Sequence, residues 1–154
     1  MTRPVKKRFR WSGKLENNPT WLCVVALALL REDGRVLMHR RPEGKHHAGL
    51  WEFPGGKVEP GETPANALVR EIREELGIFI ATEALTPAGF AQEPANNVHA
   101  PIVILLYTCS TWVGDPQALE GGAIEWVPLA ELAALDKPPL DVALAAGLVA
   151  RKAD

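Results

Sequence analysis

The chain has 154 residues, of which 47% are hydrophobic, so it is long enough for one filled core but short for two. Its net charge of -2 gives no overall attraction to nucleic acid, and no apolar run approaches the ~20 residues of a membrane span. Two isolated cysteines do not make a disulfide framework. We therefore expect one soluble domain in the reducing cytoplasm, a monomer or homodimer, with neither membrane nor nucleic acid as partner.

The first 20 residues are predicted to be a basic N-terminal arm, and residues 21–154 the domain. The cationic residues of the arm all precede the first acidic residue, Glu16: Arg3, Lys6, Lys7, Arg8, Arg10 and Lys14. No apolar segment follows within the arm, which excludes a secretory signal. A flexible, solvated arm is the plain interpretation; an organelle-targeting segment, an RNA contact and a dimer arm stay open.

Strands are expected next. Residues 21–30 are almost purely apolar, and so short a run favours a strand buried on both faces, although periodicity alone does not separate strand from helix. Residues 31–35 predict a tight turn, so we expect residues 36–40 to form the hairpin partner. Trp51 and Phe53 alternate as in a short strand, and one of them should face the core.

The ends of the following helix are marked by three residues. Thr63 suits the N-cap, and Pro64 suits the first helical position, where its missing N–H would have no partner anyway. Gly77 suits the left-handed position after the last turn. The apolar residues recur at helical spacing and predict one core-facing side: Ala65, Leu68, Ile72 and Leu76.

Carboxylates occupy the opposite side of this helix. Glu71, Glu74 and Glu75 lie at i, i+3 and i+4 and so project together. Ahead of the helix, Gly55 and Gly56 allow a sharp turn that brings backbone carbonyls close to a ligand. Carbonyl and carboxylate oxygens are the ligands that Mg²⁺ prefers. A glutamate-rich helix face is usually only solvated, so this metal hypothesis depends on the wider pattern.

The rest of the chain adds strands and helices. Residues 79–91 predict a short strand region broken by Pro87, and residues 102–111 predict a central strand. Residues 129–135 predict a short helix, and residues 141–152 a longer one with a basic end that suits its dipole. Alternating apolar strands and amphipathic helices favour an α/β layered domain without fixing the strand order.

The stretch from Gly56 to Ile78 resembles the Nudix box, G-x5-E-x7-R-E-U-x-E-E-x-G-U, where U is a bulky aliphatic residue. Every fixed position is filled: Gly56, Glu62, Arg70, Glu71, Ile72, Glu74, Glu75, Gly77 and Ile78. The flanks, residues 50–54 and 61–64, resemble the MutT-like branch of the family. The resemblance covers about residues 21–148 and implies the α/β Nudix fold, a mixed β-sheet between α-helices with a loop-helix-loop catalytic motif.

This resemblance implies a Mg²⁺ site in which Mn²⁺ substitutes. The expected metal ligands are the Gly55 carbonyl, Glu71, Glu74, Glu75 and Glu120. Glu120 matches a position that gives one more carboxylate to the site from a glycine-flanked loop, and the alternative is a plain surface carboxylate.

The catalytic roles around the metal ligands are partly open. Arg70 is expected to orient a glutamate through a charge-assisted hydrogen bond rather than to touch substrate. Either Glu71 or Glu120 would accept the proton from water. Glu62 belongs to the motif without an assigned role.

Three substrate-binding residues are expected from the resemblance. Arg41 lies where MutT-like enzymes use an arginine against phosphates, or it is a surface arginine. Phe53 matches a position near the base, where it would stack, or it belongs only to the core. Asp141 ends a segment, residues 137–141, that resembles the P-P-A-N or P-P-A-D base contact. An ionised aspartate offers only acceptors to a base, and Asp141 also suits a helix cap.

The resemblance therefore implies a Mg²⁺-dependent nucleoside triphosphate pyrophosphohydrolase, with 8-oxo-dGTP as a fitting substrate. Asp141 leaves CTP, dCTP or a modified cytosine nucleotide open. A nucleoside diphosphate sugar is a weaker alternative. A non-catalytic nucleotide-binding module is a rival of another class, although such modules tend to lose the box carboxylates that this chain keeps. Processing of RNA 5′ ends rests on the basic arm alone.

Overall fold

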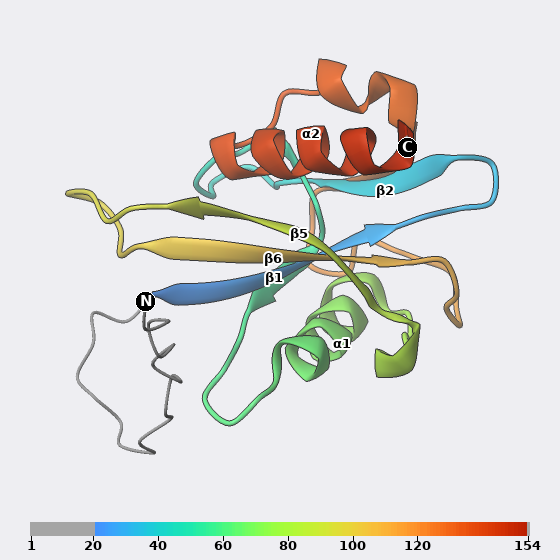
Figure 1. The fold of residues 1–154 in the computed structure, drawn as a ribbon, viewed down its shortest axis with the longest axis horizontal. Helices are drawn as coiled ribbons and strands as arrows, with labels where there is room; N and C mark the ends of the chain where they lie inside the picture. Colours follow the sequence, from blue (N-terminus) through green and yellow to red (C-terminus); the bar gives the residue numbers. More distant parts are fainter. Residues whose placement is uncertain (1–20, 154) are drawn as a thin grey trace, which may run out of the picture.

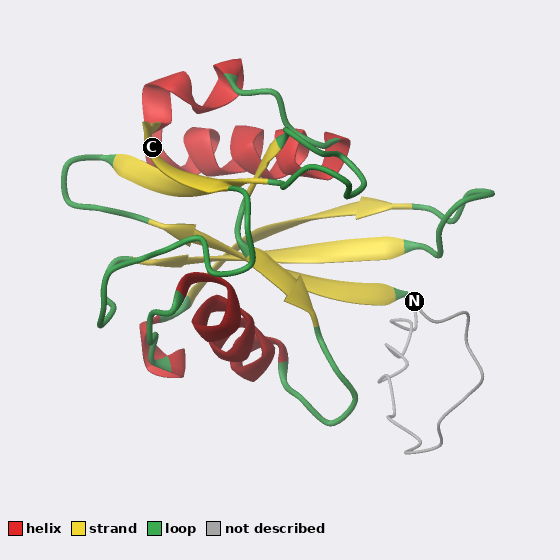
Figure 2. Cartoon of the chain, turned by 180° about the vertical axis from the view of Figure 1, so that it is seen from behind, coloured by secondary structure: helices red, strands yellow, loops and turns green. Residues whose placement is uncertain are grey.

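The computed structural model describes residues 21–153, so the basic arm predicted over residues 1–20 lies outside the described residues. The helices and strands follow one another as in Figures 1 and 2. In chain order they are β1 (Leu22–Leu29), β2 (Arg35–Arg40), β3 (Trp51–Glu52), β4 (Gly55–Lys57), α1 (Pro64–Leu76), the 3-10 helix η1 (Thr82–Ala84), β5 (Thr86–Glu93), β6 (Ile102–Cys109), β7 (Ala123–Pro128), the 3-10 helix η2 (Leu129–Ala134) and α2 (Pro139–Ala153).

The strands form two sheets. The larger has the order β4-β1-β6-β5, with β1 and β6 parallel and the other neighbours antiparallel. The smaller, β3-β2-β7, is antiparallel. Figure 1 shows α2 on one side of β1, β5 and β6 and α1 on the other, which confirms the predicted mixed sheet between helices. The helices described here fall short of the length and hydropathy that crossing a membrane requires.

β1 is buried on both faces, as predicted. Because successive strand residues point to opposite faces, its side chains divide between two core clusters. One cluster packs under α1 and receives Val25, Leu27 and Leu29. The other packs under α2 and receives Ala26, Ala28 and Leu30. The pattern fixes β1 in the middle of the molecule, between two helices.

The hairpin predicted between β1 and β2 is wrong. A single bridge, Leu30 with Val36, follows the tight turn, and β2 then pairs with β3 and β7 in the smaller sheet. The reason is that β4 already pairs with this edge of β1, and just beyond it the Leu27 N–H donates to the Pro54 carbonyl. β2 consequently carries its side chains to a different part of the molecule.

The predicted central strand is confirmed as β6, between β1 and β5. Three other features differ from the prediction. Pro87 does not break the strand region, since β5 is an edge strand and a bulge between Pro87 and Gly89 accommodates the missing donor. The short helix is the 3-10 helix η2, and α2 begins at Pro139, two residues earlier than predicted.

Candidate active site

α1 begins and ends where the sequence predicts. Thr63 is the N-cap, and its side chain accepts a hydrogen bond from the Asn66 N–H at 3.2 Å. Gly77 follows the last turn in the left-handed conformation, with φ of 71°. The core-facing side is buried at Ala67, Leu68, Ile72 and Leu76, so the helix is held firmly by packing. Its glutamates therefore project from a fixed element.

Arg70 ties the loop before α1 to the glutamates on the helix. Its guanidinium donates to both carboxylate oxygens of Glu62, at 2.7 and 2.8 Å. It also donates to Glu71 at 2.9 Å, to Glu74 at 3.3 Å and to the Lys57 carbonyl at 3.1 Å. The hydrogen bonds from Arg70 lower the pKa of Glu62 to about 2. Glu62, which the sequence left without a role, thus holds Arg70 against Glu71 and Glu74.

Glu71 lies against the glycine loop. A Cβ atom at Gly56 would come within 2.3 Å of the Glu71 carboxyl carbon, so glycine leaves the space that this carboxylate occupies. Partial burial raises the pKa of Glu71; Arg70 opposes the rise, and the charges of Glu74 and Glu120 reinforce it. Glu120 is exposed on its loop, yet its charge acts on α1. The structure therefore brings the predicted carboxylates into one region of negative potential.

Glu75 is more buried than the predicted division into one apolar and one charged face implies, with 7% of its surface exposed. Its Oε2 accepts a hydrogen bond from the Gly55 N–H at 3.1 Å. Its Oε1 lies 3.4 Å from His39 Nδ1. Burial raises the pKa of Glu75 to about 7, against the opposing effects of His39 and the Gly55 N–H. Gly55 contacts Glu75 through its N–H and not through its carbonyl oxygen. The Gly55 carbonyl therefore remains a metal ligand by prediction only.

Two residues to which the sequence analysis gave no role, His39 of β2 and Glu52 of β3, join Glu75. One potential ligand atom from each of the three lies within 4.8 Å of the others. Glu52 raises the pKa of His39, although the 3.7 Å from Nδ1 to its Oε1 is too long for a hydrogen bond. The Gly121 carbonyl and Glu75 add to this rise. The signal available in the sequence was a histidine directly after the apolar residues 36–38, within a predicted strand.

The predicted substrate residues lie next to this group. Arg41 donates to Glu52 at 3.1 Å and to the His46 carbonyl at 2.7 Å. Phe53 is 4% exposed, which leaves little of its ring for stacking. The Phe53 N–H donates to the Asp141 carboxylate at 3.0 Å. Burial raises the pKa of Asp141 to about 7.

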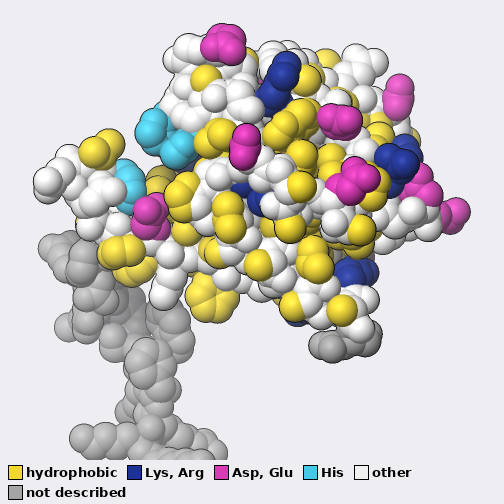
Figure 3. All heavy atoms as spheres, turned by 90° about the horizontal axis from the view of Figure 1, so that it is seen from above, with side chains coloured by type: hydrophobic (Ala, Val, Ile, Leu, Met, Phe, Trp, Pro, Cys, Tyr) yellow, Lys and Arg dark blue, Asp and Glu magenta, His cyan; other side chains and the backbone are white. Residues whose placement is uncertain are grey.

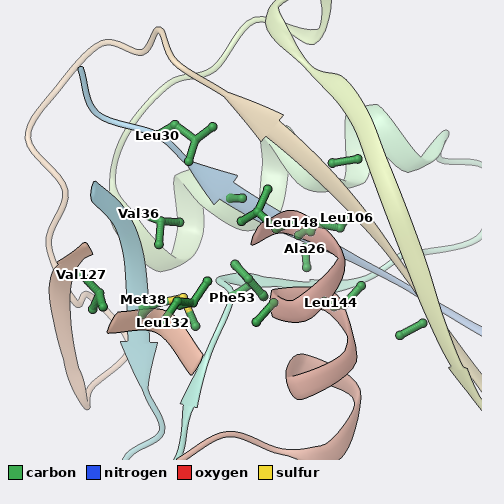
Figure 4. Packing of buried hydrophobic residues seen from close by; sticks show 14 residues of the cluster. Ala26, Leu30, Val36, Met38, Phe53, Leu106, Val127, Leu132, Leu144 and Leu148 are labelled. Carbon is green, nitrogen blue, oxygen red and sulfur yellow. The ribbon is translucent and has the colours of Figure 1, made fainter. Parts of the chain in front are cut away.

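The side chain of Phe53 belongs to the core beneath α2. Figure 4 shows it near Met38 of β2 and Leu144 of α2, members of the same buried cluster. Of the two interpretations drawn from the sequence, the core contact is the one that the structure displays. The Phe53 backbone, however, fixes Asp141 at the edge of the site.

A cavity of about 640 Å³ opens beside Arg41 and Asp141. Part of its lining comes from the end of β5 and its connection to β6, for which the sequence predicted no site residue: Glu93, Asn96, Val98 and His99. The remaining lining residues include His46, His47, Glu52 and Leu140. Figure 3, a view from above, shows histidine side chains along one edge of the molecule, close to acidic and apolar ones. The cavity is large enough for a nucleoside.

The chain matches known proteins over most of its length. A family model described as NUDIX domain matches residues 20–148. The CTP pyrophosphohydrolase of Escherichia coli strain K12 is 37% identical over 129 residues, which cover 84% of this chain and 93% of that protein. The 8-oxo-dGTP diphosphatase of the same strain is 37% identical over 119 residues, 75% of this chain and 87% of that protein.

Solved structures agree with these sequence matches. The solution structure of the E. coli ORF135 protein matches with a TM-score of 0.72 at 33% identity and covers 86% of this chain and 93% of that one. A structure from a study of MutT from Aliivibrio salmonicida and Vibrio cholerae gives 0.68 at 28% identity, with 86% and 99% covered. The chain belongs to the Nudix family. More closely, it is a MutT-like Nudix hydrolase, an enzyme of phosphoric anhydride bonds.

The donors at the site fit a divalent cation. The charge of Glu120 acts on both Glu71 and Glu75 and raises the pKa of each, and a bound cation would offset this repulsion. Gly56 leaves open the space next to Glu71. Hard oxygen donors on a rigid helix and a glycine loop are suited to Mg²⁺ or Mn²⁺ chemistry.

Proposed function

We propose that the chain is a Mg²⁺-dependent nucleoside triphosphate pyrophosphohydrolase that releases a nucleoside monophosphate and pyrophosphate. The observation that carries this proposal is that Glu71, Glu75 and Glu120 are electrostatically coupled beside a glycine loop. Glu52, which has a carboxylate oxygen within 4.8 Å of a Glu75 oxygen, lines a nucleoside-sized cavity. The Gly55 carbonyl, Glu71, Glu74, Glu75 and Glu120 would hold the ions. Mn²⁺ would substitute for Mg²⁺, because both take oxygen ligands.

The protein's own residues prepare the site for an attack by water. Mg²⁺, when bound, supplies neutralisation of the phosphate charge and increases the acidity of water. Arg70 keeps Glu71 and Glu74 in position through its charge-assisted hydrogen bonds. Partial burial raises the pKa of Glu71, which strengthens it as a proton acceptor. Glu120 is the second candidate for that role, from its loop opposite α1.

Arg41 and the cavity would bind the two ends of the nucleotide. Arg41 lines the cavity and is held by Glu52, so its guanidinium is positioned to meet a phosphate that approaches the acidic residues. Asp141 lines the same cavity. With a pKa of about 7, its carboxyl exists in both protonation states near neutral pH and is able to donate as well as accept a hydrogen bond. The limitation to acceptors, expected for an ionised aspartate, is thereby removed.

An oxidised purine triphosphate such as 8-oxo-dGTP is the proposed substrate, and CTP or a modified cytosine nucleotide is the second candidate. The relatives named above carry both activities in their names at equal identity, 37%. Asp141 supports either base, because a carboxyl that changes its proton matches donor and acceptor edges alike.

A panel assay tests the reaction and the substrate together. Product analysis with Mg²⁺ would compare 8-oxo-dGTP, dGTP, CTP, dCTP, a methylated cytosine triphosphate and a nucleoside diphosphate sugar. We expect pyrophosphate and a monophosphate from one of the triphosphates. Turnover of the sugar nucleotide alone, or release of orthophosphate instead of pyrophosphate, would overturn the proposal.

Variants connect this activity to the acidic site. Replacing Glu74 or Glu75 by glutamine removes a negative ligand, and kcat should fall more than tenfold, about 1.4 kcal/mol of barrier. Glu131→Gln, on an exposed position of η2, is the matched control and should leave kcat unchanged. Smaller losses in both site variants would argue against these glutamates as metal ligands.

A further inference from the structure

His39 is a buried histidine whose two ring nitrogens have different surroundings. It is 5% exposed, and its Nε2 lies 2.9 Å from the Gly121 carbonyl oxygen. A carbonyl only accepts hydrogen bonds, so Nε2 carries the proton in this contact. In the neutral ring, Nδ1 then presents a lone pair.

That lone pair faces two carboxylates. Nδ1 lies 3.4 Å from Glu75 Oε1 and 3.7 Å from Glu52 Oε1, and it has no hydrogen-bond partner among residues 21–153. A lone pair and two anionic oxygens repel one another in a dry site. A positive species belongs between the three atoms, either a proton or a metal ion.

We propose that His39, Glu52 and Glu75 form a binding site for a divalent transition ion of the Zn²⁺ or Co²⁺ type. Bonds of about 2.0–2.2 Å in a tetrahedral site place neighbouring ligand atoms roughly 3.4 Å apart. An octahedral Mg²⁺ site, with bonds of about 2.0–2.1 Å, places them roughly 3.0 Å apart and prefers oxygen throughout. The separations of 3.4 and 3.7 Å from Nδ1 match the tetrahedral geometry more closely.

Each of the three ligands is oriented by a hydrogen bond to a neighbouring group, as ligands in protein metal sites are. The Gly121 carbonyl fixes the His39 tautomer, the Gly55 N–H holds Glu75, and Arg41 holds Glu52. The loop that supplies the Gly121 carbonyl approaches β2 closely. A Cβ atom at Gly122 would meet the Arg40 carbonyl oxygen at 2.1 Å, so glycine is what permits this approach.

This site goes beyond the proposed Mg²⁺ reaction, with which it shares only Glu75. Imidazole is a ligand for transition ions rather than for Mg²⁺. The chain would therefore bind a transition ion even when Mg²⁺ is in excess, and that ion would occupy one carboxylate of the catalytic set.

Cobalt absorption measures this binding without any nucleotide. We expect the wild-type protein to bind Co²⁺ with visible d–d bands that persist in excess Mg²⁺. His39→Gln removes the imidazole, keeps a side-chain donor for Gly121, and should weaken Co²⁺ binding about tenfold or more. Glu131→Gln, which removes an exposed carboxylate of η2, is the control and should leave Co²⁺ affinity unchanged. Equal affinity in His39→Gln and wild type would overturn the proposal.

Nitrogen NMR of isotope-labelled wild-type protein decides the question even if the variant does not fold. With Zn²⁺ present, the Nδ1 resonance of His39 should move to the metal-bound position while Nε2 stays protonated. A protonated Nδ1 in the presence of Zn²⁺ would identify an imidazolium between two carboxylates and reject the metal site. Pyrophosphate release with Mg²⁺, assayed separately, distinguishes this failure from a failure of the proposed function.

Discussion

Asp141 places a buried carboxyl group at the first turn of α2, where it accepts the Phe53 N–H. The charged groups that face it are Glu52, Arg41 and Lys137. Burial is the principal cause of its raised pKa, which Glu52 reinforces and the Phe53 hydrogen bond opposes. A carboxyl in this state links the stability of the fold to pH.

The direction of that link follows from the two pKa values. Asp141 has a pKa of about 7 in the folded chain against a usual value of 3.8, so between them the folded state binds more protons. Its stabilisation is fully present below about pH 4 and is lost as the pH rises through about 7. From pH 5 to pH 8, wild type should therefore lose on the order of 2–3 kcal/mol more unfolding free energy than Asp141→Asn.

Urea unfolding at both pH values measures this difference. Glu75, whose pKa is also raised to about 7, titrates in both proteins, so the comparison isolates Asp141. An equal loss of unfolding free energy in the two proteins would show that Asp141 stays ionised between pH 5 and pH 8.

Gly56 tests the space in front of Glu71. Gly56→Ala would place a Cβ atom 2.3 Å from the Glu71 carboxyl carbon, and the end of a flexible side chain would move rather than the backbone. We expect kcat to fall at least tenfold, about 1.4 kcal/mol, with little change in melting temperature. Gly147→Ala, in open space on α2, is the control: it should keep kcat and stabilise the fold by about 0.5–1 kcal/mol. An active Gly56→Ala enzyme would contradict the role of this space.

The sequence predicted the residues around the box because their signals are local. Thr63 and Gly77 are recognised from neighbours along the chain, and Glu71 and Glu75 share a region because the helix repeats every 3.6 residues. His39 and Glu52 were missed because long-range pairing brings β2 and β3 to α1. No spacing in the sequence encodes that contact.

At the scale of elements, α1 depends on its N-cap. Thr63→Ala removes the acceptor of the Asn66 N–H and should lower the unfolding free energy by about 1 kcal/mol. Thr63→Ser keeps a hydroxyl and should retain most of the stability. Thermal melting of both variants measures the difference. Equal melting temperatures for Thr63→Ala and wild type would mean that packing alone fixes the start of α1.

The strands show where inference from local patterns ends. The apolar run of β1 and the turn after it were recognised from residue type, but the partner of β2 was not. Strand pairing depends on which strand edges are already occupied. One edge of β1 is occupied by a segment far along the chain, since the Leu27 N–H donates a hydrogen bond to the Pro54 carbonyl. The family resemblance supplied the sheet between helices that composition alone left open.

At the scale of the whole molecule, the site should couple metal binding to folding. Glu120 repels both Glu71 and Glu75 in the folded chain, whereas these residues are far apart in the unfolded chain. We expect Mg²⁺ to bind the folded form alone, and a concentration 100 times the dissociation constant should then add about 2.7 kcal/mol. Melting in millimolar MgCl₂ against NaCl of equal ionic strength measures this, since salt screening is then matched. An unchanged melting temperature would count against the metal site.

One isolated bridge, Leu30 with Val36, joins the two sheets along the backbone of the part described here. His39 and Glu52 belong to the smaller sheet, whereas the Gly55 N–H that holds Glu75 belongs to the larger. An ion bound by these side chains would connect the smaller sheet to the larger one. Local opening between the two sheets should then become rarer when the ion is bound. Hydrogen exchange of the β2 and β4 amides measures this opening, and it should slow as metal occupancy rises.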